Sequence, residues 1–334
     1  MSIRRFSSFG LKVSVSLFFL GYLFQAVQWQ EVWSHLIQAE PLYIVLYLIL
    51  GLIGIWVSSI KWLVLARSHR MSPSLSYIVS LYMVGYFFNN FLPTSIGGDV
   101  VRGHALGTAF GKRPEAMASV FMERFTGFTA LIVFALAALA FDSALRADLR
   151  LVAPIVFAVL AYVGIVGAIV SSKWLELGAK WIPGKVVQKV LLKVGAFQQA
   201  IQMYRHERAA LWAAGGYSIL FYLMSVLVVY VGCLTFHAPV SFTSLLTAVP
   251  VLLILFMIPF SFGGIGLQEW AYYFVLEAVG VPASIGLSLG LLFRARSVVF
   301  GLMGGAVYPF ITRGNFVHDP APLSKPAGLS KPVR

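Results

Sequence analysis

The stretch NNFLPTSIGGDVVR, residues 89–102, decides how this chain is read. It follows an apolar run, yet it brings a proline, a Gly-Gly pair, an aspartate and an arginine close together. Proline ends a helix, glycines permit a tight reversal, and a charge inside a bilayer needs a partner. The stretch therefore predicts a helix that breaks within a membrane and turns back, although a proline kink in an ordinary span is the simpler alternative.

Composition supports the membrane. Of the 334 residues, 59% are hydrophobic and 11% are charged, whereas soluble domains carry about 25% charged residues. The net charge of +13 comes from Lys and Arg in short loops between apolar runs, which indicates topology and anionic lipid rather than nucleic acid. The single cysteine, Cys233, excludes an intramolecular disulfide and a cysteine-based zinc site, and the scattered histidines predict no metal or cofactor.

The alternation of basic and non-basic loops predicts an all-α polytopic membrane protein. It has about six spanning helices and two opposed re-entrant hairpins, with both termini cytoplasmic. The first repeat, 1–141, comprises spans 11–29 and 42–66, hairpin 75–111 and span 115–141. The second, 151–310, comprises span 151–171, an amphipathic cytoplasmic connector 172–208, span 209–235, hairpin 243–279 and span 284–310, followed by a disordered tail, 311–334. The first span is expected to stay uncleaved, in a cell inner membrane.

The two breaks have one pattern. LPTSIGG (92–98) and IPFSFGG (258–264) share four positions at an offset of 166 residues. The hairpin residues are Pro93, Ser95, Gly97 and Gly98 in the first break and Pro259, Ser261, Gly263 and Gly264 in the second. One hairpin enters from each side, so the halves are predicted to be related by inverted topology, with a site near the midplane.

Charged residues within the apolar segments are candidates for binding an anionic headgroup. Arg294 shares a helix stripe with small residues and should face the interior, either on a phosphate or in a structural ion pair; Arg296 points elsewhere and could meet a carboxylate. Glu123 and Arg124 should each pair with another helix unless they sit at the membrane boundary. Asp99 could cap its helix or pair with Arg102. Lys61 is expected to snorkel. The candidate substrate-binding residues are Asn90, Asp99, Arg102, Glu123, Arg124, Glu269, Arg294 and Arg296.

Three motifs in order carry a resemblance to a family. They are N-x-LP-x-x-x-GG-D-x-x-R from Asn90 to Arg102, Glu123-Arg124, and P-x-S-x-GG-x-G-x-x-E from Pro259 to Glu269. Over roughly 10–310, the chain resembles the flippase-like family of the lysylphosphatidylglycerol synthase transmembrane region. The resemblance implies a role at lipid headgroups. About 24 residues follow Phe310, so the aminoacyl-transfer domain of bifunctional members is not expected here.

Three functions remain open. The leading one is a flippase-like translocase, not an enzyme, for an anionic phospholipid or a polyprenyl-phosphate-linked headgroup. The others are a polyprenyl-phosphate-dependent membrane glycosyltransferase, using Glu123, Asp99 or Glu269 as acid or base, and an accessory subunit of a lipid or envelope biosynthesis complex. Envelope-biosynthesis partner proteins and a homo-oligomer also stay open. The lipid, the direction and the coupling do not follow from the sequence.

Overall fold

The computed structural model describes residues 3–92, 97–170, 185–258 and 261–311, which form thirteen α-helices and no strand. Five of these helices are long and apolar enough to cross a bilayer: α3 (Pro41–Ser68), α6 (Arg113–Phe141), α8 (Leu149–Val170), α11 (Arg208–Thr235) and α14 (Ala283–Ile311). Even α8, with 22 residues, extends about 33 Å, slightly more than a hydrocarbon core. The chain is therefore a multi-pass, all-helical membrane protein, as expected.

The N-terminal region differs from the prediction. The helix α1 (Ile3–Ala26) has a shorter apolar part, Lys12–Ala26. The predicted loop after it contains a separate helix, α2 (Trp29–Ile37), because Val32 packs into a buried cluster with Tyr273 and Leu287. The predicted loop 142–150 was also wrong in part, since it contains α7 (Ser143–Ala147). Asp142 caps that helix by accepting a hydrogen bond from the Leu145 amide at 3.0 Å.

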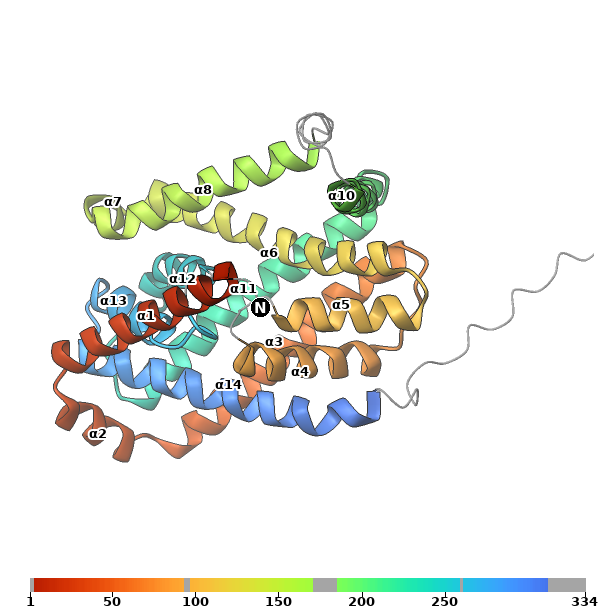
Figure 1. The fold of residues 1–334 in the computed structure, drawn as a ribbon. Coiled ribbons are helices and arrows are strands. Elements are labelled where there is room, and N and C mark those ends of the chain that lie inside the picture. The colour runs from red at the N-terminus through yellow and green to blue at the C-terminus, as the bar shows by residue number, and fades with distance from the viewer. Residues whose placement is uncertain (1–2, 93–96, 171–184, 259–260, 312–334) are drawn as a thin grey trace, which may run out of the picture.

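Two pairs of short helices occupy the positions of the predicted hairpins. They are α4 (Leu75–Phe91) with α5 (Gly97–Ala109), and α12 (Phe242–Phe256) with α13 (Leu267–Glu277). The longest, α4, has 17 residues and extends about 26 Å, which is shorter than the typical hydrocarbon core of about 30 Å. Figure 1 shows α5 lying between α4 and α6.

The turns of the hairpins are described only in part. Pro93, Ser95 and Pro259 lie outside the described residues. Gly97 and Gly98 open α5, and a Cβ on Gly98 would collide with the carbonyl oxygen of Gly85 on α4. In the second turn Gly263 and Gly264 have φ of 55° and 78°, which glycine adopts without strain. Ser261, beside them, is buried.

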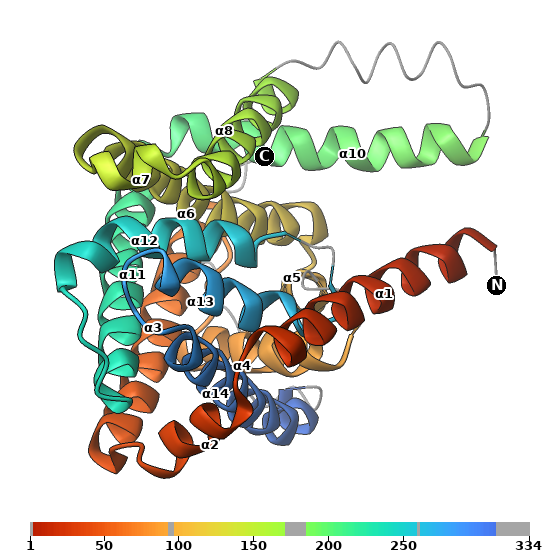
Figure 2. The same ribbon diagram turned by 90° about the vertical axis from the view of Figure 1, so that its left-hand side faces the viewer.

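The short helices pack against the long ones. The helix α3 packs along α11, α4 packs along α14, and α12 packs against α6. In each half the second short helix also packs on the following long helix, α5 on α6 and α13 on α14 (Figures 1 and 2). Of the predicted connector, residues 172–184 lie outside the described residues. Most of its remainder forms α10 (Lys185–Met203), which packs on α6 and projects from the bundle (Figure 2). The predicted tail beyond residue 311 also lies outside the described residues.

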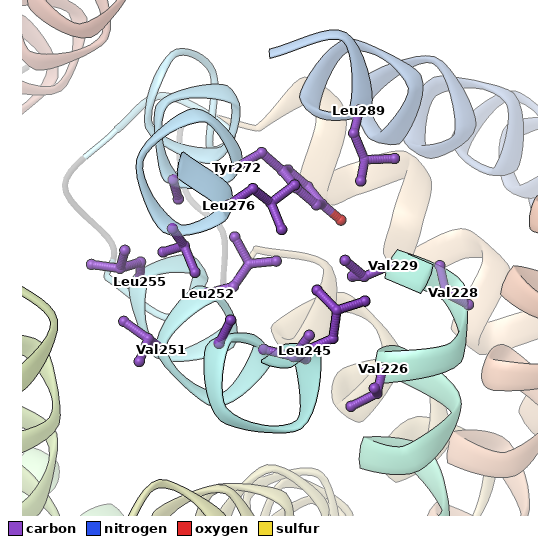
Figure 3. Packing of buried hydrophobic residues seen from close by; sticks show 14 of the residues in the cluster. Val226, Val228, Val229, Leu245, Val251, Leu252, Leu255, Tyr272, Leu276 and Leu289 are labelled. Carbon is purple, nitrogen blue, oxygen red and sulfur yellow. The ribbon is translucent and has the colours of Figure 1, made fainter. Parts of the chain in front are cut away.

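The core is apolar, and so is much of the outside. Figure 3 shows the largest buried cluster, to which α11, α12, α13 and α14 contribute residues such as Val229, Leu252, Leu276 and Leu289. Large hydrophobic side chains also point outwards, among them Phe18, Trp56, Val133 and Leu160. An outward apolar surface of this kind matches lipid tails as its solvent.

Candidate functional site: two buried ion clusters

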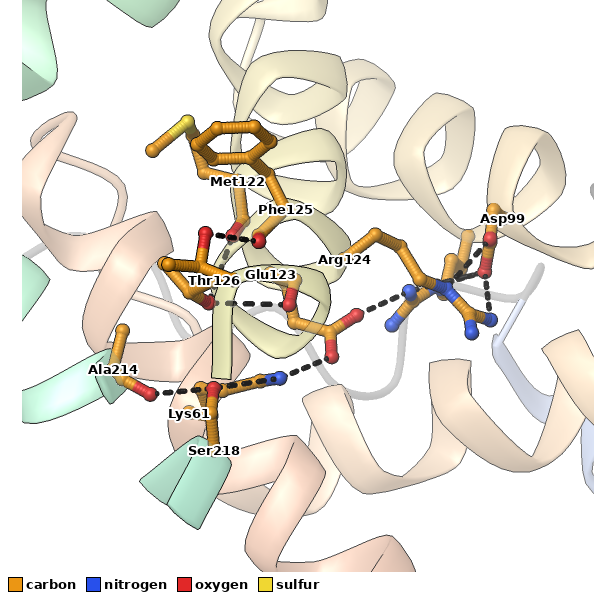
Figure 4. A network of polar contacts seen from close by, with 11 residues as sticks. Lys61, Asp99, Met122, Glu123, Arg124, Phe125, Thr126, Ala214 and Ser218 are labelled. Carbon is orange, nitrogen blue, oxygen red and sulfur yellow. Dashed lines mark hydrogen bonds and ion pairs between the residues drawn. The ribbon is translucent and has the colours of Figure 1, made fainter. Parts of the chain in front are cut away.

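Glu123 is the centre of the first ion cluster, which consists of Lys61, Asp99, Arg102, Glu123 and Arg124. Its Oε1 lies 3.0 Å from Nζ of Lys61 on α3, and its Oε2 accepts a hydrogen bond from Nη2 of Arg102 on α5 at 2.7 Å. The Glu123 side chain is 5% exposed. Three helices are therefore joined by one buried carboxylate, which Figure 4 shows between Lys61 and the α5 side.

Asp99 is the second carboxylate of this cluster and holds two arginines. It accepts a hydrogen bond from Nε of Arg102, one turn later on α5, at 3.0 Å. From α6, Arg124 donates through Nε to Oδ2 at 2.9 Å and through Nη2 to Oδ1 at 3.0 Å. That two-point contact is the geometry in which arginine also holds a phosphate. Asp99 lies in the first turn of α5, where the helix dipole favours a negative charge.

Arg102 is locked in place from several sides. Its side chain is 1% exposed, and its guanidinium carbon lies 4.7 Å from the ring centre of Trp62 and 4.2 Å from that of Tyr82. Trp62 is itself fixed, since its indole donates to Ser119 at 3.0 Å. One nitrogen of Arg102, Nη1, is buried and has no hydrogen-bond partner among the described residues. Arg102 thus forms the rigid part of the cluster.

Arg124 forms the open part. Its side chain is 51% exposed, although it lies eleven residues into α6, about 17 Å from the start of that helix. The three cations of the cluster face two carboxylates, so the cluster carries one excess positive charge. An exposed arginine at this depth is costly in hydrocarbon, and an anion or water beside it would lower that cost.

The second ion cluster is a single ion pair, formed by Glu269 on α13 and Arg294 on α14. Nε of Arg294 donates to Oε1 of Glu269 at 2.6 Å, and Nη1 donates to the Gly263 carbonyl at 3.1 Å. The other carboxylate oxygen, Oε2, accepts from the Gly266 amide at 2.8 Å. Nη2 of Arg294 is buried and has no hydrogen-bond partner in the part of the chain that the structure describes. The pair therefore fixes the turn that precedes α13.

Asn90, near the end of α4, connects the first hairpin with α14. Its Nδ2 donates to the Ser297 carbonyl at 2.8 Å, and its Oδ1 accepts from the Ser297 hydroxyl at 3.0 Å. The next residue back, Asn89, accepts from the Gly98 amide at 2.8 Å. A Cβ on Gly263 would lie 3.4 Å from the Asn89 carbonyl, so the two turns are in contact. The side chain of Asn90 thus acts as a structural link between hairpin and span.

Arg296 stands apart from both clusters. Its guanidinium carbon lies 4.5 Å from the Tyr47 ring centre and 5.1 Å from that of Phe293. The structure gives it no hydrogen bond and no ion pair within the described part of the chain, so the expectation of a carboxylate partner is not met there. The two rings lie at cation–π distance from the guanidinium.

The structure brings most candidate residues together, with Arg296 apart from them, and it corrects the expectation for Lys61. Glu123 and Arg124 each pair with other helices, Asp99 pairs with Arg102, and Glu269 meets Arg294. Lys61 does not snorkel: it is 3% exposed and pairs with Glu123, because burial on α3 places its amine within reach of that carboxylate. Lys61 was missed as a site residue, and the only signal for it was a lysine within an otherwise apolar helix.

The contacts also limit the chemistry. Both oxygens of Glu123 and both of Asp99 already contact cations, and both of Glu269 accept hydrogen bonds. None of these carboxylates has a free oxygen placed to take a proton from a substrate. Among the described residues, no three His, Cys, Asp or Glu side chains lie close enough to hold a metal ion. The site is built to hold charge.

The fold and the two ion clusters define a polytopic α-helical membrane protein that buries ionised side chains between broken and continuous helices. The chain belongs to the family described as Lysylphosphatidylglycerol synthase TM region, which it matches over residues 9–305. It is also similar to a UPF0104 membrane protein of Methanothermobacter thermautotrophicus, with 22% identity over 299 residues, covering 84% of this chain and 88% of the relative. No solved structure matches the chain.

Proposed function

We propose that this protein translocates an anionic lipid headgroup across the inner membrane, and that Arg124 binds the phosphate of that headgroup. The observation that carries the proposal is the half-exposed Arg124 fork, held by Asp99 in a cluster with one excess positive charge. A phosphodiester supplies one negative charge and two oxygens in the same geometry. It neutralises the cluster by taking the place of the Asp99 carboxylate on Arg124, while Arg102 continues to hold Asp99. The acyl chains stay in the bilayer.

The family supports a lipid substrate, because its description refers to a synthase of a phospholipid. An anionic phospholipid and a polyprenyl phosphate both present the required oxygens. The enzyme alternative receives less support, since the carboxylates that it would need are already engaged by cations or amides.

Alternating access between two inverted repeats is the mechanism that we propose. The packing supports this mechanism. If α3, α4, α5 and α6 correspond to α11, α12, α13 and α14, the contact of α4 with α14 is equivalent to that of α12 with α6, and the contact of α5 with α6 to that of α13 with α14. The helices α3 and α11, which correspond to each other, also pack together. These contacts correspond between the two halves, as related repeats require. In this scheme one hairpin opens to each side of the membrane, around a site near the midplane.

Both termini are proposed to be cytoplasmic, because Lys and Arg gather in the loops that this orientation places inside. Cys233 is the single cysteine of the sequence, so its replacement by serine gives a background free of cysteine. In that background, Arg113→Cys should be labelled by an impermeant maleimide only from the cytoplasmic side and Ser143→Cys only from outside; both side chains are exposed. Labelling of both from one side would contradict the proposed topology.

Leaflet exchange of fluorescent lipids in proteoliposomes tests the function. Wild type should exchange phosphatidylglycerol or a polyprenyl phosphate faster than a zwitterionic lipid, and Arg124→Gln should reduce that exchange at least about tenfold. The matched control is Arg150→Gln, which removes the same charge from an exposed pair with Asp148 and should leave exchange unchanged. Equal exchange by Arg124→Gln and wild type would refute the proposal.

A further inference from the structure

Arg296 occupies the middle of α14. Thirteen residues separate it from Ala283 and fifteen from Ile311, which places it about 20 Å from either end of the helix. An arginine side chain cannot snorkel over that distance. Its charge must therefore be stabilised by groups close to the middle of α14.

The residues around Arg296 contact its side chain, but among the described residues none accepts a hydrogen bond from its guanidinium. Tyr47, which is fully buried, and Phe293 contact the guanidinium through their rings. Gly51 on α3 leaves room for the stem: a Cβ there would lie 3.0 Å from Cδ and 3.2 Å from Nη1 of Arg296. Within the described residues, no side chain or carbonyl accepts a hydrogen bond from Arg296, and no carboxylate pairs with it. Arg296 is neither fully buried nor fully exposed, so part of the residue remains accessible.

We infer that Arg296 is a second anion site, which binds the phosphate of a lipid headgroup independently of Arg124. Stacked rings cover the faces of a guanidinium and leave its edge donors free for two phosphate oxygens. The aromatic contacts and Gly51 hold the fork in one orientation, which lowers the cost of ordering it on binding. The inference rests on the proposed function for the lipid as the source of the phosphate; a free phosphate ion has the same chemistry.

Native mass spectrometry of the purified protein counts retained lipid without requiring transport. After addition of phosphatidylglycerol, Arg296→Gln should retain one lipid fewer than wild type, and so should Arg124→Gln. The double variant should lose both, while Arg150→Gln should match wild type. Phosphatidylcholine should be retained less than phosphatidylglycerol at these positions. A loss on Arg124→Gln alone would overturn the second site. A loss on Arg296→Gln alone would uphold it while contradicting the proposed role of Arg124.

Two further variants address folding and the source of the phosphate. Arg296→Lys keeps the charge but removes the fork, and Gly51→Ala presses on the stem; each should weaken retention about tenfold in protein that elutes as a single species. Millimolar inorganic phosphate should displace the lipid if the free ion is the natural occupant and should leave it bound if the headgroup is. Unchanged retention in both folded variants would overturn the inference.

Discussion

Arg102 and Glu123 form a buried ion pair in which the short helix α5 carries the cation and the long helix α6 carries the acid. The second ion pair has the opposite order, since α13 carries Glu269 and α14 carries Arg294. In both pairs the charge on the short helix is fixed to the long helix that follows it in the chain. Movement of either hairpin relative to its span therefore requires a buried pair to break or to exchange partners, and an anion that enters the cluster supplies such a partner.

Asp99→Asn should bind anionic lipid more tightly but exchange it more slowly. The substitution keeps the shape of the side chain and removes the charge that competes for Arg124. Retention of phosphatidylglycerol should rise about tenfold, and release should become limiting. Retention by native mass spectrometry and exchange in proteoliposomes measure the two effects. Asp148→Asn, at the exposed pair with Arg150, is the control; weaker retention in Asp99→Asn would contradict displacement of Asp99 by the phosphate.

Lys61→Met should destabilise the protein by about 3 kcal/mol, because it leaves Glu123 buried with one cation fewer. Glu123→Gln in the Lys61→Met background should restore part of that loss. A double-mutant cycle on the free energy of unfolding measures the coupling. The exposed Asp148–Arg150 pair should show a coupling below about 1 kcal/mol in the same assay. Additive effects of the Lys61 and Glu123 substitutions would show that the buried contact contributes nothing.

Glu269→Gln should loosen the second turn. The glutamine can still accept from the Gly266 amide, but it removes the charge that holds Arg294. We expect an unfolding free energy lower by about 2–3 kcal/mol and faster hydrogen exchange at residues 263–267. Glu277→Gln changes an exposed glutamate on the same helix and should do neither. Equal effects from both substitutions would mean that Arg294 does not depend on its carboxylate.

Asn90→Ala should cost more than Ser297→Ala. The alanine at 90 removes both hydrogen bonds to α14, whereas the alanine at 297 removes only the hydroxyl donor and leaves the backbone carbonyl. At about 1 kcal/mol per hydrogen bond, the losses in unfolding free energy should be about 2 and 1 kcal/mol. Thermal unfolding of the two variants measures the order, and the reverse order would show that the Asn90 link is not structural.

Acid should weaken the contact between α3 and α10. His69 follows α3, its Nε2 donates to the Ala200 carbonyl at 3.0 Å, and its ring stacks on Tyr204. Burial lowers the pKa of His69 below its usual 6.5. The folded protein therefore favours the neutral form of His69. The contribution of this neutral form to the free energy of unfolding is lost as pH falls below about 6.5. The melting temperature should drop between about pH 7 and 5, and His69→Gln should flatten that drop. An unchanged slope in the variant would assign it to other groups.

The long helices could be predicted because a run of apolar residues is a local property, as in α11 and α14. The helix breaks could be predicted for the same reason, since proline and a Gly-Gly pair act on their own backbone. The partners of the charged residues could not be predicted: nothing in the sequence places Lys61 on Glu123, because that contact depends on how α3 and α6 pack. For the same reason Arg296 was expected to meet a carboxylate, whereas it stacks on Tyr47. The helix α2 was missed because its apolar face is short and gains its stability from contact with α14.

The excess charge of the first ion cluster has an electrical consequence. A membrane potential acts on any net charge that moves through it, by about 2.3 kcal/mol per elementary charge for each 100 mV. The empty cluster carries one such charge, and the same cluster with a monoanionic phosphodiester carries none. In the proposed transport cycle, voltage therefore acts on the movement of the first cluster when it is empty and not when it is loaded. The contribution of this cluster to turnover then depends on membrane potential through the return step.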